Sequence, residues 1–130
     1  MIAYLDASVA VSVMKEDEDG HVVRAFLDAL DPDLNTLVSG RLLETEMRRT
    51  AHRLGISAAV VDVTLTNIAI VEHERVDFRT AGRFDSANLG SLDALHLATA
   101  LRVQADVMIT RDRSLAAACV DQGLALLDVN

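Results

Sequence analysis

Four acidic residues, Asp6, Glu46, Asp93 and Asp112, lie in or next to segments that are rich in apolar residues. Asp6 ends the run Met-Ile-Ala-Tyr-Leu, and Asp112 follows Val-Met-Ile-Thr-Arg. A carboxylate among aliphatic side chains loses favourable hydration unless it is paired, caps a helix or binds a cation. Four carboxylates brought together would repel one another, and hard divalent cations such as Mg²⁺ or Mn²⁺ would relieve that repulsion. These four acids are therefore candidate ligands of a divalent metal.

The elements that must position these acids alternate between strands and helices. Short apolar runs predict strands at residues 2–5, 36–38, 68–71, 105–110 and 124–128. Helical spacing and capping signals predict helices at residues 7–14, 19–30, 40–54, 57–67, 74–85, 92–103 and 112–122. This alternation predicts an α/β fold with a mainly parallel central sheet that is covered by helices on both faces. We expect one domain spanning residues 1–130, a common domain length.

Asp6 and Asp112 lie at the carboxyl ends of two predicted strands, where open parallel sheets gather their ligands. Ser8 and Thr110 place hydroxyl groups beside them. Each aspartate also fits the N-cap of the helix that follows, a role worth about 1 kcal/mol that needs no metal. Both interpretations stay open for these two residues.

Asp93 lies in the first turn of the segment Ser-Leu-Asp-Ala-Leu-His-Leu-Ala-Thr-Ala-Leu, for which Ser91 is the expected N-cap. Leucine and alanine cover nearly every face of this helix, which predicts that it is buried against the sheet. Metal ligation is therefore favoured over capping for Asp93. His96, one turn later, is expected to be a packed or hydrogen-bonded histidine, because four acids and one histidine make no usual zinc site.

The helix at residues 40–54 offers two acids, Glu44 and Glu46, which point to different faces. Glu44 lies one turn from an arginine on either side and has the pattern of a solvated ion-pair partner. Glu46 is closer to the apolar face and is the better ligand candidate, although Glu44 stays open as the alternative.

Composition limits the classes of function. The chain has a net charge of −8, which argues against simple electrostatic adhesion to nucleic acid or anionic membrane. Aromatic residues make up only 3% of the chain, so few side chains are available to stack on nucleic-acid bases. The single cysteine, Cys119, allows no internal disulfide. The sequence shows no signal-peptide pattern and no apolar stretch of about 20 residues, so we expect a cytoplasmic protein.

Taken together, the motifs around the four acids resemble those of the PIN-domain family, and within it the toxins of the VapBC toxin–antitoxin type. The resemblance runs nearly end to end. The motifs are Tyr-Leu-Asp-Ala-Ser at Asp6, Leu-Leu-Glu-Thr-Glu-Met-Arg-Arg at Glu46, Ser-Leu-Asp-Ala-Leu-His-Leu-Ala-Thr-Ala-Leu at Asp93 and Ile-Thr-Arg-Asp-Arg-Ser-Leu at Asp112. The third motif is the most specific, and the motif spacing favours Glu46 over Glu44.

The resemblance implies a three-layer α/β/α fold and a Mg²⁺-dependent endoribonuclease, with Mn²⁺ as an alternative ion. It also implies a homodimer and a cognate VapB-like antitoxin. Asp6, Asp93 and Asp112 would bind the metal, with Glu46 ligating directly or through water. Ser8 and Thr110 would orient the carboxylates or waters around it. Arginines would hold the RNA backbone, with Arg111, Arg113, Arg49 and Arg53 as candidates.

Two other classes of function stay open at this point. A metal-dependent phosphohydrolase acting on small phosphate esters could use the same acids, but enzymes with an aspartate nucleophile usually carry a second aspartate where this chain has Ser8. The other is a non-catalytic interaction module with the PIN fold. A complete set of acids argues against it, because a site without catalytic function would gain nothing from the repulsion among four carboxylates.

Overall fold

Residues 1–129 of the chain are described by a computed structural model. The five strands are β1 (Ile2–Leu5), β2 (Thr36–Gly40), β3 (Ala69–Val71), β4 (Val107–Ile109) and β5 (Ala125–Leu126). The helices are α1 (Ala7–Met14), α2 (Glu18–Asp28), α3 (Leu42–Leu54), α4 (Ala58–Thr66), α5 (Arg75–Ala81), α6 (Ser91–Arg102) and α7 (Arg113–Asp121). Within the described residues, no helix is both long enough and apolar enough to cross a membrane.

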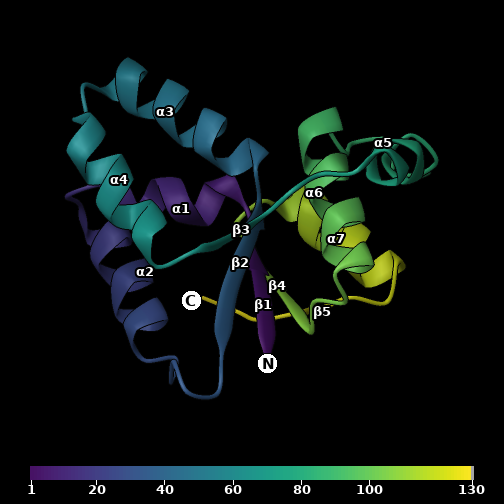
Figure 1. Ribbon diagram of the computed structural model, residues 1–130, viewed down its shortest axis with the longest axis horizontal. Coiled ribbons are helices and arrows are strands. Elements are labelled where there is room, and N and C mark those ends of the chain that lie inside the picture. Colours follow the sequence, from purple (N-terminus) through teal and green to yellow (C-terminus); the bar gives the residue numbers. More distant parts are fainter. Residues whose placement is uncertain (130) are drawn as a thin grey trace.

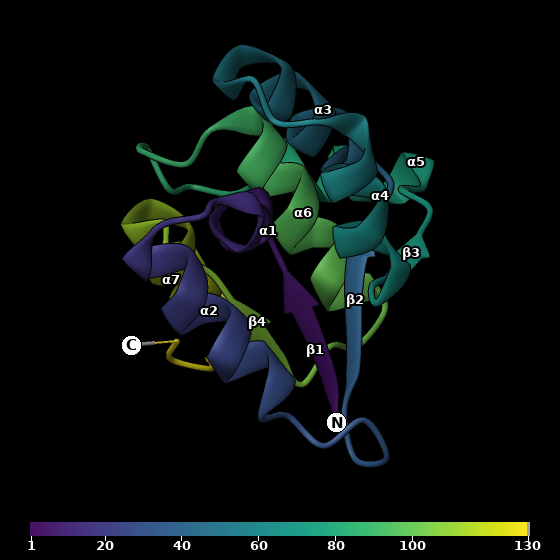
Figure 2. The same cartoon turned by 90° about the vertical axis from the view of Figure 1, so that its left-hand side faces the viewer.

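The five strands form one sheet in the order β3-β2-β1-β4-β5, and every neighbouring pair is parallel. Figure 1 shows this sheet between two groups of helices, with α1, α2, α3 and α4 on one side and α5, α6 and α7 on the other. The expected three-layer α/β/α fold is therefore confirmed. Figure 2 shows the chain entering β1 at the lower end of the molecule, so the carboxyl ends of the strands point toward α1, α3 and α6.

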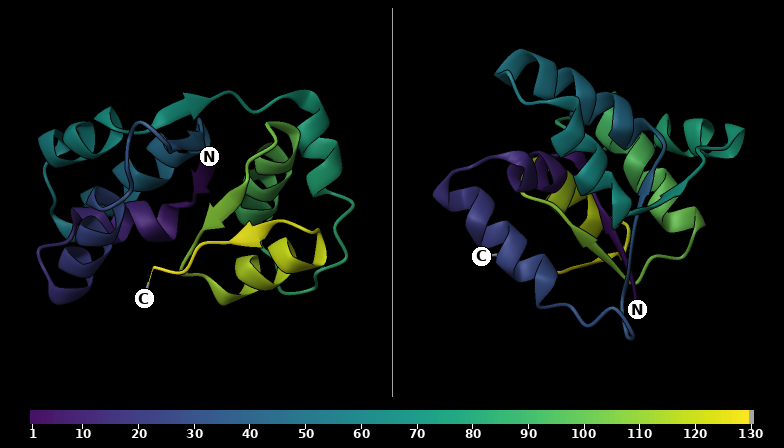
Figure 3. Two further views of the ribbon diagram at one scale, coloured as in Figure 1. Left: turned by 90° about the horizontal axis from the view of Figure 1, so that it is seen from below. Right: turned by 60° about the vertical axis from the view of Figure 1, so that its left-hand side comes forward.

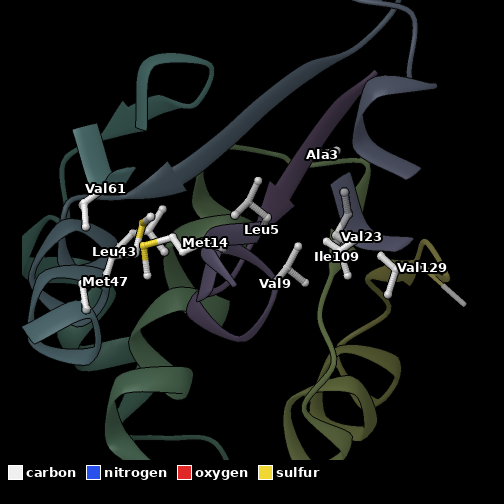
Figure 4. Close-up of a cluster of buried hydrophobic side chains, with 12 residues drawn as sticks. Ala3, Leu5, Val9, Met14, Val23, Leu43, Met47, Val61, Ile109 and Val129 are labelled. Atoms are coloured by element: carbon white, nitrogen blue, oxygen red, sulfur yellow. The ribbon is translucent and has the colours of Figure 1, made fainter. Parts of the chain in front are cut away.

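The two faces of the sheet follow from the alternation of side chains along each strand. In β1, Leu5 packs into the cluster beneath α1 to α4, whereas Tyr4 packs into the cluster beneath α6 and α7. Ile109 and Met108 in β4 divide in the same way. Figure 4 shows the first of these clusters, which contains only aliphatic and methionine side chains. Strands buried on both faces explain why these segments are continuously apolar.

The order of the strands creates a switch point in the middle of the sheet. From β1 the chain moves to β2 and β3 on one side, and later returns to β4 and β5 on the other side of β1. Figure 3 shows β4 and β5 on this second side, with β5 at the outer edge. Open parallel sheets leave a crevice beyond the carboxyl ends at such a point. Asp6 follows β1 directly, and its backbone N–H donates to the carbonyl oxygen of Ile109 at the end of β4 (3.3 Å).

Several predicted boundaries were wrong in detail. The helix predicted at 74–85 ends at Ala81, since its C-cap is Gly82 and a loop connects it to α6. Ser91 is the first residue of α6 and not its cap, because the extended cap conformation belongs to Gly90. The strands predicted at 105–110 and 124–128 shorten to β4 and β5, where the parallel pairing is confined to these few residues.

Candidate active site

Asp6 is buried at the carboxyl end of β1, with only 1% of its surface exposed. Its carboxylate accepts hydrogen bonds from the Ser8 hydroxyl (2.7 Å), the Thr110 hydroxyl (2.8 Å) and the backbone N–H of Val9 (3.4 Å). The last bond makes Asp6 the N-cap of α1. Burial raises the pKa of this carboxyl above its ordinary value, while the hydroxyl bonds oppose that change. Asp6 is thus both a helix cap and a buried acid held in a fixed orientation.

Asp112 is placed by the start of α7. Its carboxylate accepts from the backbone N–H of Leu115 (2.8 Å), so the N-cap interpretation is confirmed here too. Its own backbone N–H donates to the Thr110 hydroxyl oxygen (3.0 Å), and that hydroxyl donates to Asp6. Thr110 therefore connects two of the candidate acids across β1 and β4, although Asp6 and Thr110 are separated by 104 positions in the chain.

Asp93 lies in the first turn of α6 and is partly buried. The pKa of its carboxyl is raised to about 6, first by burial and then by the negative charges of Asp112, Asp6 and Glu46. Like charges raise a carboxyl pKa only when they are near enough to oppose its ionisation. The fold therefore brings all four candidate acids into one electrostatic environment.

The two glutamates of α3 have different surroundings. Glu44 accepts from Arg48 (3.0 Å) and lies within 4.0 Å of Arg41, as the ion-pair interpretation predicted. Glu46 is directed instead at His96, whose Nε2 atom is 2.5 Å from Oε1 of the glutamate. The charge of Glu46 contributes to the raised pKa of Asp93. The geometry thus favours Glu46 as the fourth acid of the cluster.

The acid cluster fits a divalent cation by its chemistry. Among residues 1–129, no lysine or arginine forms an ion pair with Asp6, Asp93 or Asp112, so their negative charge is left uncompensated. Within the same residues, no three histidine, cysteine or acidic side chains already converge closely enough to hold an ion by themselves. Mg²⁺ usually keeps several waters and takes only one or two carboxylates directly, so a more open set of oxygen donors suits it.

The candidate arginines differ in how far they are available to a ligand. Arg49, Arg53 and Arg113 are exposed, and the described part of the chain offers them no acidic partner. Arg111 lies 3.9 Å from Asp19, and its side chain donates to Ser12 (3.4 Å). Three of the four side chains are therefore free to contact an external anion.

Sequence reasoning missed one part of the site. The sequence pattern places Tyr4 only in an apolar strand, yet its hydroxyl lies 2.6 Å from Nδ1 of His96. The expectation that His96 is a hydrogen-bonded, packed histidine is confirmed. The available signal was the alternation in β1, which places Tyr4 on the opposite face from Leu5 and thus beneath α6.

An apolar cavity lies on the side of the sheet that α1, α2 and α4 cover. This apolar cavity of about 730 Å³ lies among α1, α2, α4 and β2, and its lining includes Val13, Leu27, Val60 and Val63. None of the four candidate acids lines it.

The family model for the PIN domain matches residues 3–120 of the chain. A search of curated proteins finds no match.

Solved structures share the fold at low sequence identity. The VapBC2 structure from Rickettsia felis, bound to a DNA fragment from its promoter, has a chain of 16% identity with a TM-score of 0.76, covering 98% of each chain. The VapC20 toxin of Mycobacterium tuberculosis, described as cleaving the sarcin-ricin loop, shows 14% identity and a TM-score of 0.74, covering 89% of this chain and 94% of that one. FitAcB from Neisseria gonorrhoeae shows 18% identity and a TM-score of 0.71, covering 99% and 98%.

Proposed function

This chain belongs to the PIN-domain family, and from that premise we propose that it is a metal-dependent endoribonuclease, the toxin of a type II toxin–antitoxin pair. The observation that supports the proposal is that Thr110 links the Asp6 carboxylate to the backbone of Asp112 at the switch point of the sheet. The charges of Asp112, Asp6 and Glu46 also raise the pKa of the Asp93 carboxyl. The similar structures support it, because one of them is described as a toxin that cleaves the sarcin-ricin loop.

Asp6, Asp93 and Asp112 would hold one or two Mg²⁺ or Mn²⁺ ions, with Glu46 binding directly or through water. When bound, such an ion supplies Lewis-acid activation for hydrolysis of a phosphodiester. The chain supplies the orientation. Ser8 and Thr110 fix both oxygens of the Asp6 carboxylate, and the first turn of α7 fixes Asp112.

The substrate would enter over the carboxyl ends of the strands. Arg49, Arg53 and Arg113 have no acidic partner within residues 1–129 and are candidates to contact the RNA backbone, with Arg111 as a fourth. Net repulsion from a chain of charge −8 means that local arginines and the bound cation, rather than the overall field, must attract the RNA.

Cleavage of total transfer and ribosomal RNA by the purified protein tests the proposal. We expect cutting that requires Mg²⁺ or Mn²⁺, stops with EDTA and is abolished by Asp6→Asn. Asp33→Asn is the matched control, because Asp33 is exposed in the turn before β2, at the other end of the sheet. Cutting that is equal in Asp6→Asn and parent and unaffected by EDTA would refute the nuclease function. Turnover of a simple phosphate monoester without RNA cleavage would favour the phosphohydrolase.

We also propose that the protein has a cognate antitoxin, forms a homodimer and works as a single domain in the cytoplasm. Similar structures that include antitoxin complexes support the first part. The apolar cavity among α1, α2 and α4 adds support, since exposed Val60 and Val63 at its rim suit an apolar protein segment. Co-expression with the product of a short neighbouring reading frame tests it, with co-purification and loss of RNA cleavage as the expected result.

A further inference from the structure

His96 is completely buried, yet both of its ring nitrogens have polar partners. Nδ1 lies 2.6 Å from the hydroxyl of Tyr4, and Nε2 lies 2.5 Å from Oε1 of Glu46. The side chain thus connects a strand residue in the middle of the sheet with an acid of the candidate site.

The chemistry of the two partners sets the direction of these bonds. An ionised carboxylate can only accept, so Nε2 carries the proton that is donated to Glu46. The Tyr4 hydroxyl carries a proton that it can donate, and Nδ1 is the ring nitrogen left to accept it. In the neutral imidazole, donation from Tyr4 to Nδ1 selects the tautomer with the proton on Nε2.

Tyr4 is itself held in place. Its hydroxyl reaches the backbone at Gly40, where an added Cβ would lie only 2.7 Å from the hydroxyl oxygen and 2.1 Å from Cε1 of His73. The rings of Tyr4 and His73 each meet the ring of His96 edge-on, with centroids 5.7 and 5.6 Å apart. Gly40 therefore provides the close approach on which this arrangement depends.

Tyr4, His96 and Glu46 form a series of hydrogen bonds, and Glu46 is its end on the side of the other candidate acids. Its side chain is 17% exposed, and within the described residues only one of its two oxygens, Oε1, has a hydrogen-bond partner. The second oxygen is left for another ligand, and His96 joins Glu46 to α6, the helix that carries Asp93 one turn earlier. A flexible glutamate fixed at one oxygen presents the other in a defined position.

We propose that His96 and Tyr4 are positioning residues that orient Glu46 toward a divalent cation shared with the other acids. The inference rests on the proposed metal-dependent nuclease function. Partners that orient a carboxylate ligand in this way change metal affinity or activity by about 10- to 100-fold when they are lost.

Two substitutions of His96 separate positioning from packing. In His96→Gln the side-chain amide nitrogen of the glutamine is separated from Cα by the same number of bonds as Nε2 of the histidine. This variant therefore keeps a donor toward Glu46. In His96→Asn the side-chain amide nitrogen is separated from Cα by the same number of bonds as Nδ1 of the histidine. This variant therefore loses the donor toward Glu46 but keeps a polar group near Tyr4. Both variants remove the buried ring, and urea denaturation measures the stability cost that they share.

The activity readout uses the transfer or ribosomal RNA that the parent cleaves best. We expect His96→Asn to lower kcat by about 10- to 100-fold at unchanged KM, and His96→Gln to stay within about threefold of the parent. Equal loss in both variants would show that His96 acts only through packing, and equal retention would show that Glu46 needs no such partner. Either outcome overturns the proposal.

Two readouts are independent of RNA. Calorimetric titration with Mn²⁺ should show affinity weakened about tenfold or more in His96→Asn but not in His96→Gln. Nitrogen NMR of the metal-free parent should show a proton on Nε2 of His96, and an Nε2 without a proton overturns the proposal. If these two readouts hold while the parent cleaves no RNA, the nuclease function fails and the positioning role stands.

Discussion

Asp93→Asn should make the metal-free protein more stable at neutral pH and remove part of its pH dependence. The pKa of the Asp93 carboxyl is raised to about 6 in the fold by burial and by Asp112, Asp6 and Glu46, against 3.8 for an unperturbed aspartate. The folded protein therefore keeps this proton at a pH where the unfolded chain has lost it. The contribution of the Asp93 carboxyl to the free energy of unfolding is fully present below about pH 4 and is lost as the pH rises through about 6.

The size of the effect follows from the two pKa values. A difference of about 2 pKa units corresponds to about 3 kcal/mol across the whole range, at 1.36 kcal/mol per unit. Between about pH 5 and pH 8 the same two values give a loss of about 1.4 kcal/mol. Asp93 is only partly buried, and screening by solvent reduces this to about 0.7–1 kcal/mol. Asparagine keeps the volume and has no charge, so this loss is absent in the variant.

Urea denaturation of the parent and Asp93→Asn at about pH 5 and about pH 8, with EDTA present, measures the difference. The change in the free energy of unfolding between the two pH values should be smaller in the variant by about 0.7–1 kcal/mol. Taking the difference removes the contributions of the titrating groups that do not interact with Asp93. Asp33→Asn, exposed at the far end of the sheet, should match the parent. When Mn²⁺ replaces EDTA, it should stabilise the parent at about pH 8 more than the variant, because the ion binds the folded state.

Equal pH dependence in the parent and Asp93→Asn would refute the reasoning. It would mean that the neighbouring acids do not oppose the ionisation of Asp93, and the electrostatic argument for one shared site would fail with it. Asp93→Asn that is less stable than the parent at both pH values would mean that the carboxylate makes a favourable bond in the fold, contrary to the uncompensated charge described above.

The remaining predictions concern stability and are measured by urea denaturation. Gly40→Ala should cost about 1–3 kcal/mol, because the new Cβ would lie 2.1 Å from His73, and a cost below about 0.5 kcal/mol would contradict the close packing. Gly82→Ala is its control, since the nearest atom is 3.5 Å away, and it should stabilise by about 0.4–1 kcal/mol. Asp77→Asn should cost about 2–4 kcal/mol, because this buried carboxylate accepts from Arg102 at 2.8 Å, and no loss of stability would show the ion pair to be dispensable.

Much of the fold could be read from local pattern. Continuous apolar runs, separated by segments with the spacing of helices, indicated strands that are buried on both faces. The alternation of strands and helices predicted the parallel sheet and the three-layer fold. Boundaries were harder to predict, because the length of a strand depends on its partner. β4 stops at Ile109 where its pairing with Leu5 ends, and no property of residues 105–110 alone shows this.

The residues of the candidate site can likewise be divided into those that local sequence predicts and those that only the tertiary structure shows. The sequence by itself determined which acids sit at strand ends and helix starts, since capping and apolar context are local properties. Only the tertiary structure showed that Glu46 and Tyr4 both contact His96, which adds to the preference for Glu46 over Glu44 that the motif spacing gives. The physical reason is that those contacts join residues 50 and 92 positions apart, and strand order and helix packing, which no local pattern encodes, fix them in space.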